Sequence, residues 1–150
     1  MTLRYLDADS DDYSDGSVMQ QCTDPGATWY RASDLTSTTA DCNDSNAAVH
    51  AGATEIVANG IDNDCNSQEL CYADTDGDGF GSVSTVTSAN LTCTDNGESM
   101  TSDDCNDADA NEKPGQVRYA DDDDDAYSNG NSQIACTQPE GYTSKEQLLS

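Results

Sequence analysis

Apolar side chains are sparse along this chain, and they almost never recur at helical spacing. The best helical candidate is a short turn at residues 45–49. In residues 82–88, valine alternates with serine or threonine, which is typical of an edge strand. Gly, Asn and Asp break most of the remaining chain into turns. The pattern predicts a small, irregular, mostly β and loop fold with short β-hairpins and almost no helix.

One polar pattern occurs three times: an aromatic residue, aspartates at alternate positions, and a second aromatic. Numbered from the first aspartate, the carboxylates occupy positions 1, 3 and 5, and the second aromatic occupies position 7. Calcium loops surround one ion in this way, with carboxylates at alternate positions and a backbone carbonyl at position 7. We therefore expect three calcium loops. The expected ligands are Asp7, Asp9, Asp11 and Tyr13 in loop one; Asp74, Asp76, Asp78 and Phe80 in loop two; and Asp121, Asp123, Asp125 and Tyr127 in loop three.

The three loops differ in how well position 6 suits a left-handed turn. Gly79 accepts that conformation freely, Asp12 moderately and Ala126 poorly. Taken alone, residues 121–125 would read as a solvated acidic run, but their register with the other two loops favours a metal site. None of the loops has Glu at position 12, where an EF-hand closes. The missing ligands must therefore come from elsewhere in the chain.

A second motif, Asp-Cys-Asn-Asp, occurs at residues 41–44 and 104–107 and is called the DCND segment below. It is the obvious source of the missing ligands, although it could also be only a capped turn. The candidate ligands are Asp41, Asp44, Asp104 and Asp107. Asp62 and Asp64 either contribute to a further site or are simple turn residues.

The charge of the chain limits its partners. At pH 7 the formal net charge is -25, from 30 acids against 5 bases, and 24 of the acids are Asp. A nucleic-acid partner is excluded because phosphate binding needs a basic face. No apolar run is long enough to span a membrane. Two carboxylates ~4 Å apart repel by about 1 kcal/mol even in water, so a chain with many such contacts needs divalent cations.

Cysteine and histidine usage argues against zinc and places the chain outside the cytosol. There are seven cysteines, none in a Cys-x-x-Cys pair, and His50 is the one histidine. The small number of apolar residues also implies stabilisation by disulfides or metals. His50 is a weak copper candidate, but the surrounding carboxylates suit a hard cation better. We expect several calcium ions and an extracellular or cell-surface location.

The two motifs divide the chain into tandem repeats. Repeat one spans 1–70 and carries an insertion at 53–70, repeat two spans 71–118, and repeat three, 119–150, contains a loop but no DCND segment. In such arrays each unit contacts mainly its neighbours.

These motifs closely resemble the extracellular "putative metal-binding motif" repeats of bacterial and archaeal surface proteins. The matching sequences are YADTDGDGFG (72–81), DCNDSNAAVHAGATE (41–55) and GIDNDCN (60–66). More distantly, the chain is similar to thrombospondin type 3 repeats, which wrap aspartate loops round calcium and hold them with disulfides. The resemblance implies metal binding without specifying a biological role. One departure is Val57, which stands where that family usually has a cysteine, so that Cys65 lacks its expected partner.

From the order of the motifs and this departure, we expect the disulfides Cys22–Cys42, Cys93–Cys105 and Cys65–Cys71. Cys136 is then left unpaired, in a repeat without a DCND segment, and is expected either to bond a partner in trans or to bond a cysteine of the same protein outside this sequence. A head-to-tail contact of this kind would propagate as a filament.

The sequence favours a structural, non-enzymatic role, since it contains no nucleophile–base arrangement and no catalytic-metal motif. We expect a calcium-binding surface fibre, stalk or matrix component that self-associates. The alternatives are a metal-scavenging or adhesive binding module, and a non-catalytic appendage of a larger secreted protein. Asn90 and Asn43 lie in glycosylation sequons, and Asn90 is favoured because Asn43 is crowded by Cys42.

Overall fold

The computed structural model describes residues 2–23 and 25–149. Within these ranges the chain contains nine short strands, one turn of 3-10 helix and no α-helix. The strands form three small antiparallel sheets of three strands each. The prediction of a mostly β and loop fold with almost no helix is confirmed. Residues 45–49, the best helical candidate in the sequence, form turns and no helix, in agreement with the short turn expected there.

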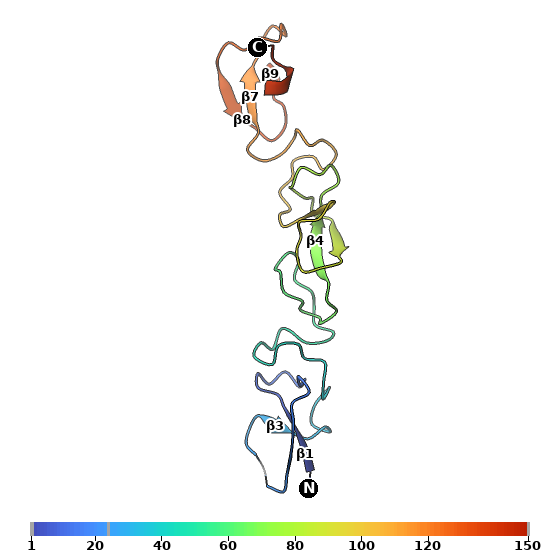
Figure 1. Ribbon diagram of the computed structural model, residues 1–150. Coiled ribbons are helices and arrows are strands. Elements are labelled where there is room, and N and C mark those ends of the chain that lie inside the picture. Colours follow the sequence, from blue (N-terminus) through green and yellow to red (C-terminus); the bar gives the residue numbers. More distant parts are fainter. Residues whose placement is uncertain (1, 24, 150) are drawn as a thin grey trace. The chain divides into compact units, whose positions relative to one another are not determined.

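Each sheet has the same topology, with the strand that comes first in the sequence at its centre (Figure 1). The first sheet has the order β2-β1-β3, the second β5-β4-β6 and the third β8-β7-β9. The strands are β1 (Thr2–Leu6), β2 (Val18–Gln21), β3 (Trp29–Tyr30), β4 (Glu69–Ala73), β5 (Thr85–Ser88), β6 (Glu98–Ser99), β7 (Val117–Ala120), β8 (Ser132–Ile134) and β9 (Tyr142–Thr143). The 3-10 turn, η1, spans Lys145–Gln147. Strand β5 is an edge strand inside residues 82–88, where the alternating pattern predicted one.

Each central strand leads directly into one of the three Asp-rich loops. Asp7 follows β1, Asp74 follows β4 and Asp121 follows β7. The loop then returns the chain as an outer strand beside the central one; Tyr5 pairs with Val18 in the first sheet, and Tyr119 with Ser132 in the third. The sheets therefore fix both ends of each loop.

The described chain divides into two compact parts. The first contains the described residues up to Ile56, together with Gly60–Glu69 and Ala89–Leu91. The second contains Val57–Asn59, Leu70–Ser88 and the described residues from Thr92 onwards. The first sheet lies in the first part and the third sheet in the second part.

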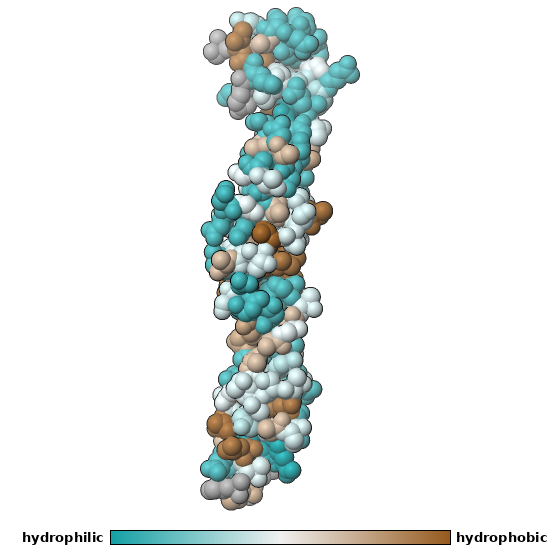
Figure 2. Space-filling model, turned by 90° about the vertical axis from the view of Figure 1, so that its right-hand side faces the viewer, coloured by the Kyte–Doolittle hydropathy of each residue, from teal (hydrophilic) through white to brown (hydrophobic). Residues whose placement is uncertain are grey.

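Polar side chains take much of the place of an apolar core. The buried apolar residues are few and small: Val49, Cys71, Cys93 and Ala120. Fully buried polar residues are larger, and include Arg118, Glu69, Asn63 and Asp7. On the face shown in Figure 2, apolar residues occur in small separate groups among hydrophilic ones. Apolar burial alone is therefore a weak source of stability for this chain.

The predicted disulfide scheme is wrong. The structure pairs Cys42 with Cys65, Cys71 with Cys93, and Cys105 with Cys136, over Cα separations of 5.9, 5.4 and 5.5 Å. Cys22 is the free, exposed cysteine among the described residues. Cys136 is therefore not the unpaired cysteine that we expected to bond in trans.

The reason for the error lies in where the strands place the sulfur atoms. Cys71 lies on the central strand β4 and, like Cys93, is buried, so these two close within one sheet. Cys105 bonds forward, to the cysteine that follows β8 of the third sheet. The sequence scheme had instead paired Cys22 and Cys93 with the DCND cysteines later in their own repeats, and Cys65 with Cys71.

Gly81 allows a close backbone approach directly after loop two. Its N–H donates to the Thr101 carbonyl at 3.0 Å. A Cβ at this position would lie 2.8 Å from Thr101 O, 2.9 Å from Tyr72 Cβ and 3.0 Å from Ala73 O. We predict that Gly81→Ala lowers the free energy of unfolding by about 1–3 kcal/mol.

The check is a denaturant or thermal melt followed by circular dichroism. Val83→Ala is the control, because Val83 is 84% exposed and its truncation should change stability by about 0.5 kcal/mol or less. Equal stability of the Gly81 variant and the control would contradict the steric argument.

Candidate metal centre

The aspartate at position 1 of each loop is buried and organises the loop backbone. Asp7, Asp74 and Asp121 are 1%, 5% and 7% exposed. Both carboxylate oxygens of each accept backbone N–H groups from within the loop. In loop one the donors are Ser10 at 2.7 Å, Asp11 at 3.3 Å and Asp12 at 3.2 Å; in loop two, Gly77 at 2.7 Å and Gly79 at 2.9 Å; in loop three, Asp125 at 3.1 Å and Ala126 at 3.2 Å. This aspartate therefore shapes each loop, whether or not it also binds an ion.

The aspartate at position 5 holds the end of each loop. One of its oxygens accepts the N–H of the position 7 aromatic, at 2.7 Å from Tyr13 to Asp11, 2.9 Å from Phe80 to Asp78 and 2.8 Å from Tyr127 to Asp125. The three loops thus share one hydrogen-bond pattern, in agreement with their shared register in the sequence.

Two positions in each loop have left-handed backbone. At position 6, where the sequence predicted this turn, φ is 71° for Asp12, 92° for Gly79 and 67° for Ala126. Position 4 is also left-handed, with φ of 68° at Ser10, 80° at Gly77 and 55° at Asp124. The sequence analysis missed position 4, although Gly77 was the available signal.

Loops one and two contain buried carboxylate oxygens to which nothing donates. They are both oxygens of Asp9 and the Oδ2 atoms of Asp11, Asp76 and Asp78. The backbone amides of Asn46 and Asp11 come near Asp9 and favour its charged form, but neither makes a hydrogen bond with it. Lys113 Nζ lies 3.8 Å from Asp78 Oδ2. Buried carboxylate oxygens without donors are costly, and a cation would satisfy them.

The DCND segments fold back onto loops one and two, and their fourth residue binds the loop backbone. Asp44 Oδ1 accepts the N–H of Ala8 at 2.9 Å. At the matching place Asp107 accepts the N–H of Thr75 at 2.8 Å and its hydroxyl at 2.7 Å.

The first aspartate of each DCND segment caps a turn with one oxygen and buries the other. Oδ1 of Asp41 and of Asp104 caps the turn, accepting the N–H of Asn43 at 2.7 Å and of Asn106 at 3.2 Å. Oδ2 of each is buried and has no donor. Asp41 is only 7% exposed, and its carboxylate lies with those of Asp9 and Asp11 within 4.8 Å. A capped turn alone would not require an oxygen to be buried beside other carboxylates.

The carboxylates of loop one form two overlapping groups. Asp9 belongs to the group with Asp11 and Asp41 and also to a group with Asp7 and Asp44, each within 4.8 Å. In loop two, Asp74, Asp76 and Asp78 form one such group. Each group offers only oxygen ligands.

Burial and mutual repulsion raise several pKa values in these groups. The pKa of Asp9 is raised by burial and then by the charges of Asp11 and Asp7. Burial is also the main cause of the raised pKa values of Asp41, Asp44 and Asp76. Asp107 differs, because hydrogen bonds from Thr75 lower its pKa.

Loop three is more open than the other two. Asp121, Asp123 and Asp125 again lie within 4.8 Å, but Asp123 and Asp125 are exposed. Tyr127 is 56% exposed. No DCND carboxylate among the described residues closes this loop, as its place in the sequence implied.

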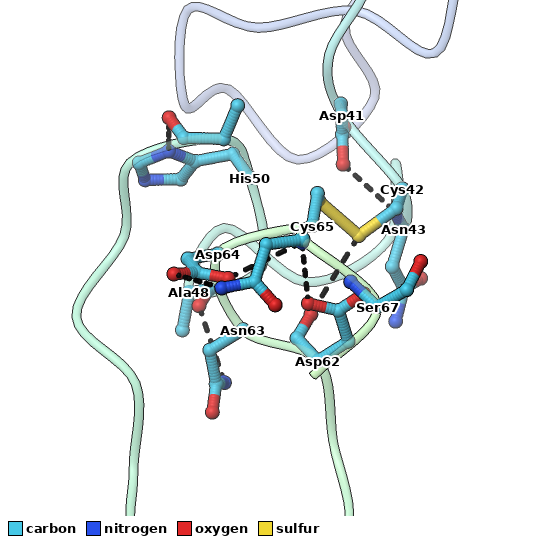
Figure 3. Close-up of a disulfide and its surroundings, with 12 residues drawn as sticks. Asp41, Cys42, Asn43, Ala48, His50, Asp62, Asn63, Asp64, Cys65 and Ser67 are labelled. Atoms are coloured by element: carbon cyan, nitrogen blue, oxygen red, sulfur yellow. Dashed lines mark hydrogen bonds between the residues drawn. A yellow bond between two sulfur atoms is a disulfide. The ribbon is translucent and has the colours of Figure 1, made fainter. Parts of the chain in front are cut away.

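The insertion of repeat one contains a fourth carboxylate group, of Glu55, Asp62 and Asp64, which lie within 4.8 Å. Asp62 behaves as a position 1 aspartate, accepting Asn66 N–H at 2.8 Å and Ser67 N–H at 2.7 Å (Figure 3). Asn66 Oδ1 accepts Gln68 N–H at 2.7 Å, as position 5 does elsewhere.

Glu55 of this group and the nearby Asn66 were missed in the sequence. Glu55 receives the N–H groups of Asn63 and Asp64, both at 3.3 Å, and its signal was the glutamate that ends the quoted 41–55 motif. Asn66 stands where the other loops have aspartate, and the same alternate spacing could have found it.

His50 and the two sequon asparagines belong to none of the carboxylate groups. The His50 ring stacks on Tyr13 with centroids 4.3 Å apart, and its Nδ1 lies 3.2 Å from the Ala51 carbonyl. Asn43 is exposed and belongs to the DCND turn, whereas Asn90 is partly exposed.

Parts of the sequence are also similar to a known protein family. Two segments, residues 41–69 and 104–125, match the model of the family described as "Putative metal-binding motif". They contain the two DCND segments, the Glu55 group and residues 121–125 of loop three, whereas loops one and two lie outside them. The predicted resemblance is confirmed, and the family's name refers to copper binding.

Neither a curated protein nor a solved structure matches the chain. Three disulfides are typical of proteins that fold in an oxidising compartment rather than in the cytosol. Where the chain is described, no helix has the length and apolar character needed to cross a membrane.

The raised pKa values predict how the metal-free protein responds to pH. A carboxyl whose folded pKa is raised contributes stability below its unfolded pKa, and this contribution is lost as pH rises through the folded pKa. Asp9, Asp41, Asp44 and Asp76 act in this direction and Asp107 in the opposite one. We predict that the melting temperature in metal-depleted buffer falls as pH rises from about 4 to 7.

Asp9→Asn should remove part of this decline, raising the metal-free melting temperature at pH 7 more than at pH 4. Asp103→Asn is the control, since Asp103 is exposed and belongs to none of the carboxylate groups. The measurement is the melting temperature of the metal-free proteins across this pH range. A melting temperature that rises with pH in metal-depleted buffer would show that repulsion in the loops does not control stability.

Proposed function

We propose that this chain is an extracellular calcium-binding structural repeat protein in which the ions complete the fold. The observation that carries the proposal is the set of buried carboxylate oxygens without donors in loops one and two and in the DCND segments. Each belongs to a site whose backbone is already fixed by hydrogen bonds. A divalent cation would replace repulsion among these oxygens with attraction.

Calcium is the ion that best suits these donors. The side chains in the groups offer oxygen alone, and position 7 adds a backbone carbonyl, which favours a hard cation. Copper would prefer imidazole or sulfur ligands, but His50 is stacked on Tyr13 and six cysteines are in disulfides. Because the closing Glu of an EF-hand is missing, we expect dissociation constants of roughly 10⁻⁴–10⁻³ M, suited to extracellular calcium.

A structural rather than an enzymatic role follows from the use of the charged groups. The carboxylates accept hydrogen bonds from the loop backbone or lie beside other carboxylates. Small sheet units of this kind support arrays of repeats in other proteins. We propose a surface fibre, stalk or matrix component that self-associates, and a glycan at Asn90 rather than Asn43. A metal-scavenging or adhesive module is the alternative, and would release metal while keeping its fold.

The neighbouring residues Asp103 and Asp104 allow a matched test of calcium binding. Asp104 has a buried Oδ2 without a donor, whereas Asp103 is exposed. We predict that Asp104→Asn weakens calcium binding at loop two by at least about tenfold, because a charged ligand is lost. Asp103→Asn removes the same charge one residue away and should leave the affinity close to that of the unchanged protein.

The measurement is isothermal titration with calcium, with magnesium and copper(II) as comparison ions. Chelation should also lower the melting temperature strongly, because little apolar area remains to hold the fold. Equal calcium affinity in the two variants, or tighter copper binding that is lost in His50→Ala, would overturn the assignment of calcium to these loops. A fold that survives chelation unchanged would favour the scavenging alternative.

A further inference from the structure

The first and third sheets place an arginine and a cysteine at matching positions. Arg4 pairs with Met19 across β1 and β2, and Arg118 pairs with Gln133 across β7 and β8. Cys22 and Cys136 each follow the first aspartate of their loop by fifteen positions. The two hairpins therefore have the same length and the same register, with no insertion between arginine and cysteine.

In the third sheet this arginine and cysteine hold a DCND segment. Cys136 is bonded to Cys105, the cysteine of the preceding DCND segment. Arg118 donates from one guanidinium nitrogen to the Asn111 carbonyl at 2.6 Å and to the Cys136 carbonyl at 3.4 Å. The N–H of Ala135 donates to the Gln116 carbonyl at 3.0 Å. Residues 105–116 thus lie against the third sheet, and Arg118 is only 2% exposed.

In the first sheet the equivalent side chains lack this cover. Arg4 is partly exposed, and Cys22 is exposed with a free thiol. The second sheet is different, because Cys71 occupies the place of the arginine and bonds Cys93 within its own sheet. Arg4 therefore occupies the place of Cys71, and the central strand of the first sheet contains no cysteine. The first sheet is of the type that receives a segment, as the third sheet does.

We propose that Arg4 and Cys22 form a docking site for the DCND segment of another metal-binding repeat, joined through a disulfide to Cys22. The occupied site on the third sheet shows the contacts: a carbonyl of the segment on the arginine and a sulfur–sulfur bond. Both DCND cysteines of this chain, Cys42 and Cys105, are already in disulfides. The segment that docks on the first sheet is therefore supplied from outside residues 2–149. This inference rests on the third sheet and holds whichever metal fills the loops.

The bond forms by thiol–disulfide exchange. The Cys22 thiolate attacks the sulfur of an incoming DCND cysteine that is held in a mixed disulfide with a small thiol. A new sulfur–sulfur bond forms, the old one breaks, and the small thiol leaves as its thiolate, so no further oxidant is needed. Two free thiols would instead need a disulfide oxidant such as oxidised glutathione, which takes up two electrons and leaves as two thiols.

The test uses the whole chain and a synthetic peptide with the sequence of residues 104–116, DCNDADANEKPGQ. The peptide cysteine carries a thionitrobenzoate group, whose release is followed by absorbance. We expect the peptide to react with Cys22 at least about tenfold faster than a scrambled peptide of the same composition and modification. Cys22→Ser should abolish the reaction.

Arg4→Gln should reduce the rate with the native peptide to that of the scrambled one. Arg31→Gln is the matched control, because it removes the same charge from an exposed arginine outside the hairpin. Equal rates for the native and scrambled peptides would overturn the proposal without any variant being needed. Faster formation of a Cys22–Cys22 dimer than of the peptide adduct would also overturn it, by showing an exposed thiol without a specific partner.

Discussion

The burial of carboxylates beside one another is the constraint on which the rest of this structure depends. Four small residues form the apolar core, while aspartates such as Asp7 and Asp41 are almost fully buried. Their backbone hydrogen bonds fix the shape of the loops but leave several charged oxygens without donors. Desolvation and repulsion then oppose the fold that the hydrogen bonds define. A bound cation reverses the sign of this interaction, which makes metal binding and folding one process.

The sequence predicted the loops well because their determinants are local. The hydrogen bonds that the Asp7 carboxylate accepts come only from residues three to five positions away, so alternate spacing in the sequence already contains this geometry. The return of Asp41 and Asp44 to loop one could be predicted because a loop without its closing ligand needs one. Glu55 was missed for the opposite reason: its partners are eight and nine residues away, across the insertion, and no local spacing connects them.

The disulfides could not be predicted because their pairing depends on which strand each cysteine occupies. Cys71 and Cys93 face one another only because β4 is the centre of its sheet. The position three residues before the loop holds a cysteine in the second sheet, which closes on itself, and an arginine in the third, which holds a DCND segment. Order along the chain contains no information on this choice until the sheet register is known.

The DCND segment joins the two kinds of stabilisation in four residues. In residues 104–107, Asp104 and Asp107 turn back to loop two, while Cys105 between them bonds forward to Cys136, between β8 and β9 of the third sheet. Residues 41–44 repeat this division, with Asp41 and Asp44 directed to loop one and Cys42 bonded to Cys65 of the insertion. An ion that draws the aspartates into the loop also fixes the position of the cysteine between them. If the proposed ion fills a loop, its binding would therefore also order the disulfide formed by the DCND cysteine that follows that loop.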